Sequence, residues 1–138
     1  MNSKKILIFG VFDGIHDGHR YFIDEAKTHG NHLVAIVARD NIVEKIKGKA
    51  PVENEVERIE NLLENKEVDL VLLGDAELGT YNVLREVAPD IIFLGYDQNE
   101  LLKDLKNKIK SGYLKEVEIR VGAPYKGDEL HSSILNKK

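Results

Sequence analysis

The chain has 138 residues, 42% of them hydrophobic and 32% charged, which is typical of one soluble globular domain and excludes a disordered chain or a membrane protein. The net charge of -4 at pH 7 argues against a general nucleic-acid binder, and the absence of cysteine excludes disulfides, thiolate metal sites and a thiol nucleophile. The apolar run near the N-terminus is too short for a signal peptide or a membrane span, so we expect a cytoplasmic protein with a single domain over residues 1–138.

The first predicted element is a strand at residues 5–9, because its continuous apolar run is typical of a strand buried on both faces. A helical pattern begins near Asp17. Between the two, Gly10 and Gly14 permit a tight turn, and the Asp13 carboxylate can brace that turn by accepting hydrogen bonds from its backbone. The turn therefore leads into the N-terminus of a helix.

Two histidines, His16 and His19, occupy this helix start, with Gly18 between them. Free backbone N–H groups and the positive end of the helix dipole favour an anion there. Side chains three residues apart in a first turn point the same way, so both histidines would converge on one phosphate. A capping histidine beside an ordinary glycine turn is the simpler interpretation, but the combination favours a phosphate site. The chain has neither a P-loop nor a dinucleotide-binding motif that would explain the turn.

Further apolar runs predict strands at residues 33–38, 69–73 and 90–94 and, more weakly, at 116–121. Apolar residues at helical spacing lie between these runs: Phe22 and Ala26; Val56, Ile59, Leu62 and Leu63; Leu84, Val87 and Ala88; Leu101, Leu105 and Ile109. This alternation predicts an α/β fold, a doubly wound five-stranded parallel sheet with helices on both faces. Ligands of such sheets bind beyond the carboxyl ends of the strands, near the switch point of strand order, where the histidine turn lies.

Three lysines, Lys45, Lys47 and Lys49, surround Gly48 after the second predicted strand. They form either a solvated loop, since exposed lysines need no explanation, or a mobile arm that closes over a polyphosphate. A histidine phosphate site at the same sheet edge favours the arm, and Lys47 is the first choice for a phosphate contact.

Asp97 follows the fourth predicted strand, within Gly95-Tyr96-Asp97-Gln98. Its carboxylate either caps the next helix or accepts hydrogen bonds from a ribose or a base, and the two interpretations are compatible. Near the C-terminus, His131, Ser132 and Ser133 indicate either a plain helix start or the binding site for the far end of a triphosphate.

Together these segments resemble the nucleotidyltransferase superfamily that is marked by a His-x-Gly-His signature, here His16-Asp17-Gly18-His19. The resemblance covers almost the whole chain. Residues 37–49 and 94–98 look most like the archaeal FAD synthase branch, and the chain is also similar to glycerol-3-phosphate cytidylyltransferase. The resemblance implies a Rossmann-like nucleotidyltransferase fold.

The resemblance also implies roles for particular residues. The catalytic residues would be His16, His19 and Lys47, and Lys45 and Lys49 would belong to the loop that closes on the phosphates. The nucleotide would be held by Val11, Phe12, His16, Asp17, Gly18, His19, Asp97, Ser132 and Ser133. Family members often carry a basic residue just before the serine-rich turn, where this chain has Asp128-Glu129-Leu130-His131.

The implied reaction is transfer of AMP from ATP to FMN, which gives FAD and pyrophosphate. The acceptor phosphate is already an anion, so no general base is required, and a divalent ion, Mg²⁺ first of all, would be held by substrate phosphates rather than by protein ligands. The flavin ring needs an apolar slot, for which Tyr81, Tyr96, Tyr113 and Tyr125 are candidates.

Two other functions stay open at this point. The first is a cytidylyltransferase that uses CTP and glycerol 3-phosphate or another small phosphate ester. The second, suggested by the altered C-terminal tail, is a nucleotide-binding module without turnover. In every case we expect small-molecule substrates, no nucleic-acid or membrane partner, and a possible homodimer.

Overall fold

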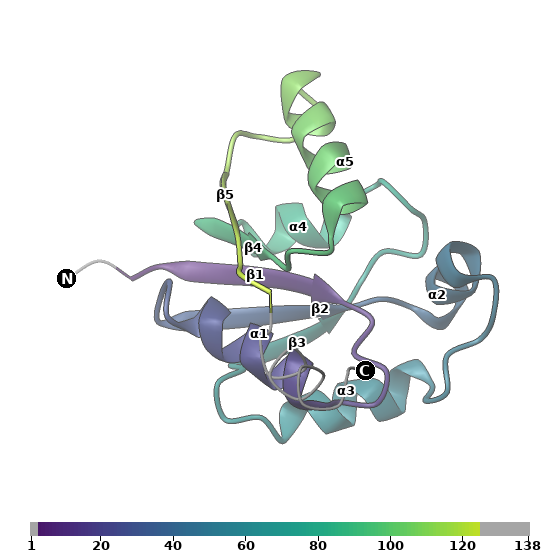
Figure 1. The fold of residues 1–138 in the computed structure, drawn as a ribbon. Coiled ribbons are helices and arrows are strands. Elements are labelled where there is room, and N and C mark those ends of the chain that lie inside the picture. The colour runs from purple at the N-terminus through teal and green to yellow at the C-terminus, as the bar shows by residue number, and fades with distance from the viewer. Residues whose placement is uncertain (1–2, 125–138) are drawn as a thin grey trace.

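The computed structural model describes residues 3–124, and in it five parallel strands form one sheet in the order β3-β2-β1-β4-β5 (Figure 1). The strands are β1 (Lys5–Gly10), β2 (His32–Val37), β3 (Leu70–Leu73), β4 (Ile91–Leu94) and β5 (Glu118–Val121). The helices are α1 (Asp17–Lys27), α2 (Asp40–Lys47), α3 (Glu55–Leu63), α4 (Asn82–Val87) and α5 (Asn99–Lys110). The predicted α/β fold with a five-stranded parallel sheet is confirmed.

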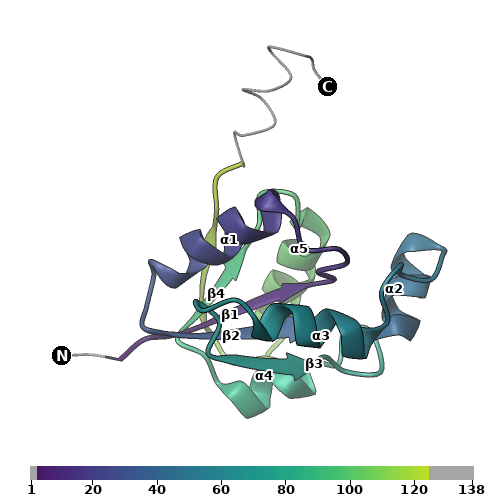
Figure 2. The same ribbon diagram turned by 90° about the horizontal axis from the view of Figure 1, so that it is seen from below.

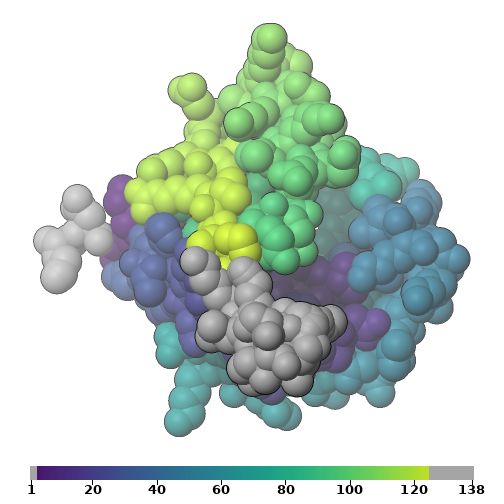
Figure 3. Space-filling model, in the orientation of Figure 1, coloured from purple at the N-terminus to yellow at the C-terminus, as the bar shows by residue number. Residues whose placement is uncertain are grey.

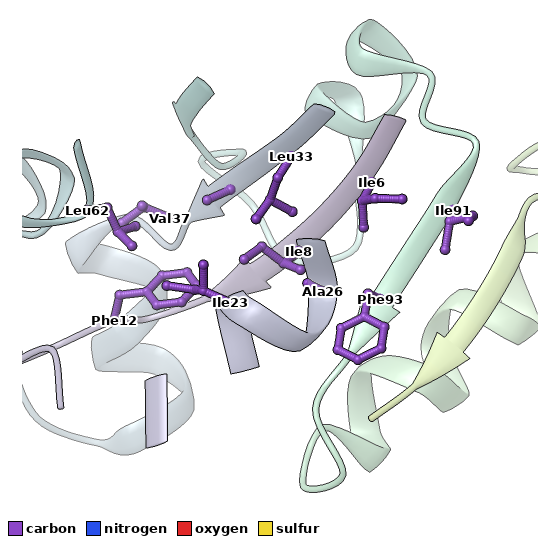
Figure 4. Packing of buried hydrophobic residues seen from close by; sticks show 11 residues of the cluster. Ile6, Ile8, Phe12, Ile23, Ala26, Leu33, Val37, Leu62, Ile91 and Phe93 are labelled. Carbon is purple, nitrogen blue, oxygen red and sulfur yellow. The ribbon is translucent and has the colours of Figure 1, made fainter. Parts of the chain in front are cut away.

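Helices cover both faces of the sheet, as expected for a doubly wound fold (Figure 2). Alternate side chains of β1 point to opposite faces, so Ile6 and Ile8 pack toward α1 and α3, whereas Leu7 packs toward α4 and α5. Figure 4 shows the first of these two cores, in which Ile23 and Ala26 of α1 lie over the sheet. No helix of the described residues is long and apolar enough to span a membrane.

One face of α3 differs from the prediction. Helical spacing assigned Val56 and Leu63 to its apolar face, but each is 60% exposed, and Arg58 and Leu62 are the buried residues of this helix. The spacing of Val56 and Leu63 is helical, but it follows the outer face of α3. Of the other two residues predicted for this face, Leu62 is buried and Ile59 packs against the same core, so apolar spacing placed the helix correctly and identified half of its inner face.

The predicted lysine loop is also wrong in form, because Lys45 and Lys47 lie in the last turn of a helix, α2. Gly48 ends that helix in the left-handed conformation with φ 75°, as a C-terminal glycine commonly does, and Lys49 follows it. The buried residues Ile42 and Val43 provide an apolar face for this helix. Lysines in its last turn interact favourably with the negative end of the helix dipole.

The sheet order places β1 between β2 and β4, so the direction of winding reverses beside β1. This is the switch point at which open α/β sheets bind ligands. In Figure 1, α2 lies beyond the carboxyl end of β1. The space-filling view shows the purple segment after β1 recessed between the blue α2 and the green residues around the start of α5 (Figure 3).

Candidate active site

The first turn of α1 is closed by its two histidines. His16 is the N-cap residue, and its Nδ1 accepts a hydrogen bond from the Gly18 N–H at 3.0 Å. His19 accepts in return, from the His16 N–H to its own Nδ1 at 3.2 Å. The two rings stack with their centroids 3.9 Å apart. The structure therefore places both histidines side by side at the helix start, in a reciprocal capping box.

These backbone bonds fix the tautomer of both rings. A nitrogen that accepts a backbone N–H carries no proton, so the ring proton of His16 and of His19 sits on Nε2. Burial is the largest cause that lowers the pKa of His19 to about 4, and the proximity of the His16 ring and the Lys47 ammonium adds to it, although Asp97 opposes the shift. His19 is thus a neutral Nε2–H donor near pH 7, and it can bind an anion without becoming a cation.

Phe12 forms the base of the histidine turn. It is 2% exposed, and its ring centroid lies 5.8 Å from that of His19. Its φ of 56° is in the left-handed region, which costs free energy for a residue other than glycine. A Cβ on Gly10 would lie only 2.6 Å from the Phe12 ring, so the residue at position 10 has to be glycine. The buried Phe12 side chain supports the turn from below.

Asp13 braces the histidine turn against another segment of the chain. It was expected to bond within its own turn, but its carboxylate accepts from the backbone N–H groups of Val52 and Glu53, each at 2.8 Å. Glu53 in turn accepts from the Gly14 N–H at 2.8 Å. Burial of Asp13 opposes its ionisation, but these two backbone bonds, with the charges of Arg58 and Lys47, outweigh it and lower the pKa of the carboxyl.

Arg58 joins three segments around the site, and sequence reasoning missed it. Its side chain is fully buried, and its guanidinium donates to three carbonyl oxygens, those of Val11, Ala38 and Glu53, at 2.8 to 3.0 Å. It also pairs with the Asp40 carboxylate at 2.6 Å. Arg58 therefore holds the segment after β1, the end of β2 and the first turn of α2 in one arrangement.

Gln98, which sequence reasoning also missed, ties the ends of β1 and β4 together. Its Oε1 accepts from the Gly95 N–H at 2.8 Å, and its Nε2 donates to the Phe9 carbonyl at 3.0 Å. Gln98 is the N-cap residue of α5, so the interpretation of Asp97 as the cap is wrong. The exposed Asp97 side chain stays available to a ligand.

A cavity of about 470 Å³ opens between these segments at the carboxyl ends of β1 and β4. Of the predicted site residues, it is lined by Val11, Phe12, His16, Gly18, His19, Lys47 and Asp97. The structure does not bring Asp17, Lys45 or Lys49 to this lining, and Asp17 pairs instead with Arg20 at 2.9 Å. Ser132 and Ser133 lie outside the described residues.

A second hollow, of about 440 Å³, lies at the carboxyl end of β3 and shares no lining residue with the first. Its charged lining consists of Arg39 against three carboxylates, those of Asp75, Glu77 and Glu86. This negative excess disfavours a phosphate, so the histidine cavity is the better candidate site. Within residues 3–124, no three His, Asp or Glu side chains are grouped closely enough to hold a metal ion.

Comparison with known proteins agrees with this geometry. A family model described as cytidylyltransferase-like matches residues 7–135. The FAD synthase of Thermococcus sibiricus is 38% identical over 99% of this chain and 93% of its own length, and that of Thermoplasma acidophilum is 39% identical over 97% and 92%.

Solved structures are similar as well. A lipopolysaccharide core biosynthesis protein from Thermoplasma volcanium is 35% identical, with a TM-score of 0.78 over 90% of this chain and 99% of its own. Pantothenate synthetase from Thermus thermophilus, at 14% identity and a TM-score of 0.59 over 87% of this chain and 55% of its own, shares the fold alone.

Proposed function

The chain belongs to the cytidylyltransferase-like family of nucleotidyltransferases, and we propose that it transfers AMP from ATP to FMN, giving FAD and pyrophosphate. The observation that carries this proposal is the similarity to FAD synthases along almost the whole chain, in a protein whose paired histidines line a cavity at the switch point. Several further archaeal FAD synthases are 36% to 39% identical to it.

In the proposed reaction, a phosphate oxygen of FMN attacks the α-phosphorus of ATP. A new P–O bond forms, the bond from the α-phosphorus to the bridging oxygen breaks, and pyrophosphate leaves with the electron pair. The attacking phosphate is anionic already, so the protein needs no general base. Its task is to position two anions and to stabilise the charge that develops between them.

The described residues supply donors for this task at one end of the cavity. The Nε2–H groups of His16 and His19 are hydrogen-bond donors, and the start of α1 adds its dipole. Lys47 contributes a positive charge from α2. Mg²⁺ held by the ATP phosphates would supply further positive charge to offset theirs, beside the donors of His16, His19 and Lys47.

The proposal is tested by measuring pyrophosphate release with ATP or CTP, each combined with FMN or glycerol 3-phosphate, in the presence of Mg²⁺. We expect turnover with ATP and FMN only, and FAD as the product. Turnover with CTP and glycerol 3-phosphate would overturn the proposal in favour of a cytidylyltransferase. Binding of nucleotide without pyrophosphate release from any pair would favour a module that does not turn over.

Replacing Lys47 and Lys45 one at a time distinguishes the lysine that lines the cavity from a nearby lysine that does not. We expect Lys47→Ala to lower kcat/KM for ATP on the order of a hundredfold, because a charge that stabilises the phosphates is lost. Lys45→Ala is the matched control, since Lys45 lies on the same helix but does not line the cavity, and it should stay within about threefold of the wild type. Steady-state rates at varied ATP decide between them, and equal losses in both variants would contradict a specific role for Lys47.

Other parts of the expected function rest on the sequence. The cradle for the triphosphate at Ser132 and Ser133 belongs to this proposal, because these residues lie outside the described part of the chain. The single domain over residues 1–138, the cytoplasmic location and the homodimer also stay predictions.

A further inference from the structure

Four tyrosines were candidates for an aromatic slot, and the structure separates three of them. Tyr81 is buried and donates from its hydroxyl to the Asp104 carboxylate. The ring of Tyr113 is stacked beneath the Arg85 guanidinium, 4.3 Å from its centroid. Both rings are therefore already used within the fold. Tyr96 alone of these three lines the histidine cavity.

Tyr96 presents an uncovered ring to that cavity. It is 52% exposed, and it has no hydrogen bond or ring contact within residues 3–124. Ile46, in the last turn of α2, lines the same cavity and is 55% exposed. Two large apolar side chains on different elements, both open to the same cavity, leave apolar surface that a ligand can bury.

We propose that Tyr96 and Ile46 hold the isoalloxazine ring of FMN, Tyr96 by stacking and Ile46 by apolar contact. This inference rests on the proposed function and specifies where the acceptor lies. Ile46 directly precedes Lys47, so the last turn of α2 contacts both the flavin ring and the ATP phosphates. The acceptor is thereby placed in the same cavity as the histidine donors.

A flat heteroaromatic ring is common to flavin and adenine, and the size and apolar edge of the ring favour flavin. The isoalloxazine ring is wider than a purine and carries an apolar dimethylated edge, which suits apolar contacts from two separate elements. Asp97, next to Tyr96, offers a carboxylate that a ribose or an amino group can bind, so a polar contact for the nucleoside stands beside the apolar one.

The test is a titration of FMN fluorescence with protein in the presence of a non-hydrolysable ATP analogue, α,β-methylene-ATP. A tyrosine stacked on isoalloxazine quenches its fluorescence. We expect wild type and Tyr96→Phe to bind FMN with similar affinity. Tyr96→Leu should bind FMN about tenfold more weakly and with less quenching. In a separate steady-state assay, the KM of Tyr96→Leu for ATP should stay unchanged. Tyr113→Leu is the matched control, because Tyr113 is similarly exposed but lies outside the cavity, and it should bind FMN as the wild type does.

Different failures are distinguishable. Equal FMN affinity in Tyr96→Leu and wild type, or a rise in KM for ATP alone, would overturn the inference, and FAD formation by the wild type would leave the proposed function intact. If the wild type binds FMN through Tyr96 but makes no FAD, the proposed function fails and the ring site stands. Ile46→Ser gives an independent check, because Ile46 lies on a different element from Tyr96. A loss of FMN affinity in this variant would support the same site.

Discussion

His19→Ala is expected to lower kcat with ATP and FMN by about a hundredfold or more, while the protein stays folded. Removal of one preorganised donor to a developing oxyanion has an effect of this order in other enzymes. The His19 Nε2–H is such a donor, because its Nδ1 is already bonded to the His16 N–H and its ring lines the cavity. Single-turnover rates would measure the loss, and near-normal activity would remove His19 from the proposed mechanism.

His19→Gln distinguishes the capping role of the His19 ring from the role of the imidazole in binding phosphate. Glutamine at the third position of a helix accepts from the N-cap backbone N–H, as His19 does, so the capping box is retained. We expect His19→Ala to lose about 0.5 to 2 kcal/mol of stability and His19→Gln to lose little. Both variants should lose most of the activity. Full activity in His19→Gln would show that the imidazole ring itself is not required, since the glutamine amide can both accept from the backbone and donate an N–H.

The same ring predicts a pH dependence. Burial and nearby positive charges lower the pKa of His19 from 6.5 to about 4, so the unfolded chain takes up a proton first as the pH falls. The stability that the neutral ring contributes is complete above pH 6.5 and is lost as the pH falls from 6.5 toward 4. Urea unfolding across that range should show a smaller loss in His19→Gln than in the wild type. The titration of His19 should leave kcat unaffected around neutral pH.

The features that sequence predicted are those with a local signature. The strands were found because β1 and β2 are buried on both faces and therefore read as apolar runs. The histidine turn was found because its chemistry is contained in four consecutive residues at a strand end. The helix α2 was missed because its buried face consists of only two residues, Ile42 and Val43.

The supporting contacts of the site had no local signature. Arg58 bonds to a carbonyl 47 residues away in the chain, and Gln98 to one 89 residues away. Each looks like an ordinary polar residue on a predicted helix, and only the fold brings it to its partner. For this reason the residues that could touch ligand were predictable, whereas the residues that hold them in place were not.

Arg58→Met is expected to have the largest effect on stability, with a loss of about 3 to 5 kcal/mol in the free energy of unfolding. The substitution leaves the partly buried carbonyls of Val11, Ala38 and Glu53 without their donor, and it separates the Asp40 carboxylate from its cation. An unpaired buried polar group costs far more than the bond itself contributes. Urea denaturation followed by circular dichroism would measure the loss.

Arg20→Met is the matched control, because Arg20 lies on the surface and, within residues 3–124, pairs only with the exposed Asp17, so its loss should stay within about 0.5 kcal/mol. Arg58→Lys should also be strongly destabilised, since an ammonium cannot reproduce the planar fork that reaches four acceptors. If Arg58→Met lost less than about 1 kcal/mol, water would have to satisfy these carbonyls, and the segment after β1 would not depend on α3 for its position. A large loss would instead mean that the histidine turn and α2 are held to one another by a residue that never meets the ligand.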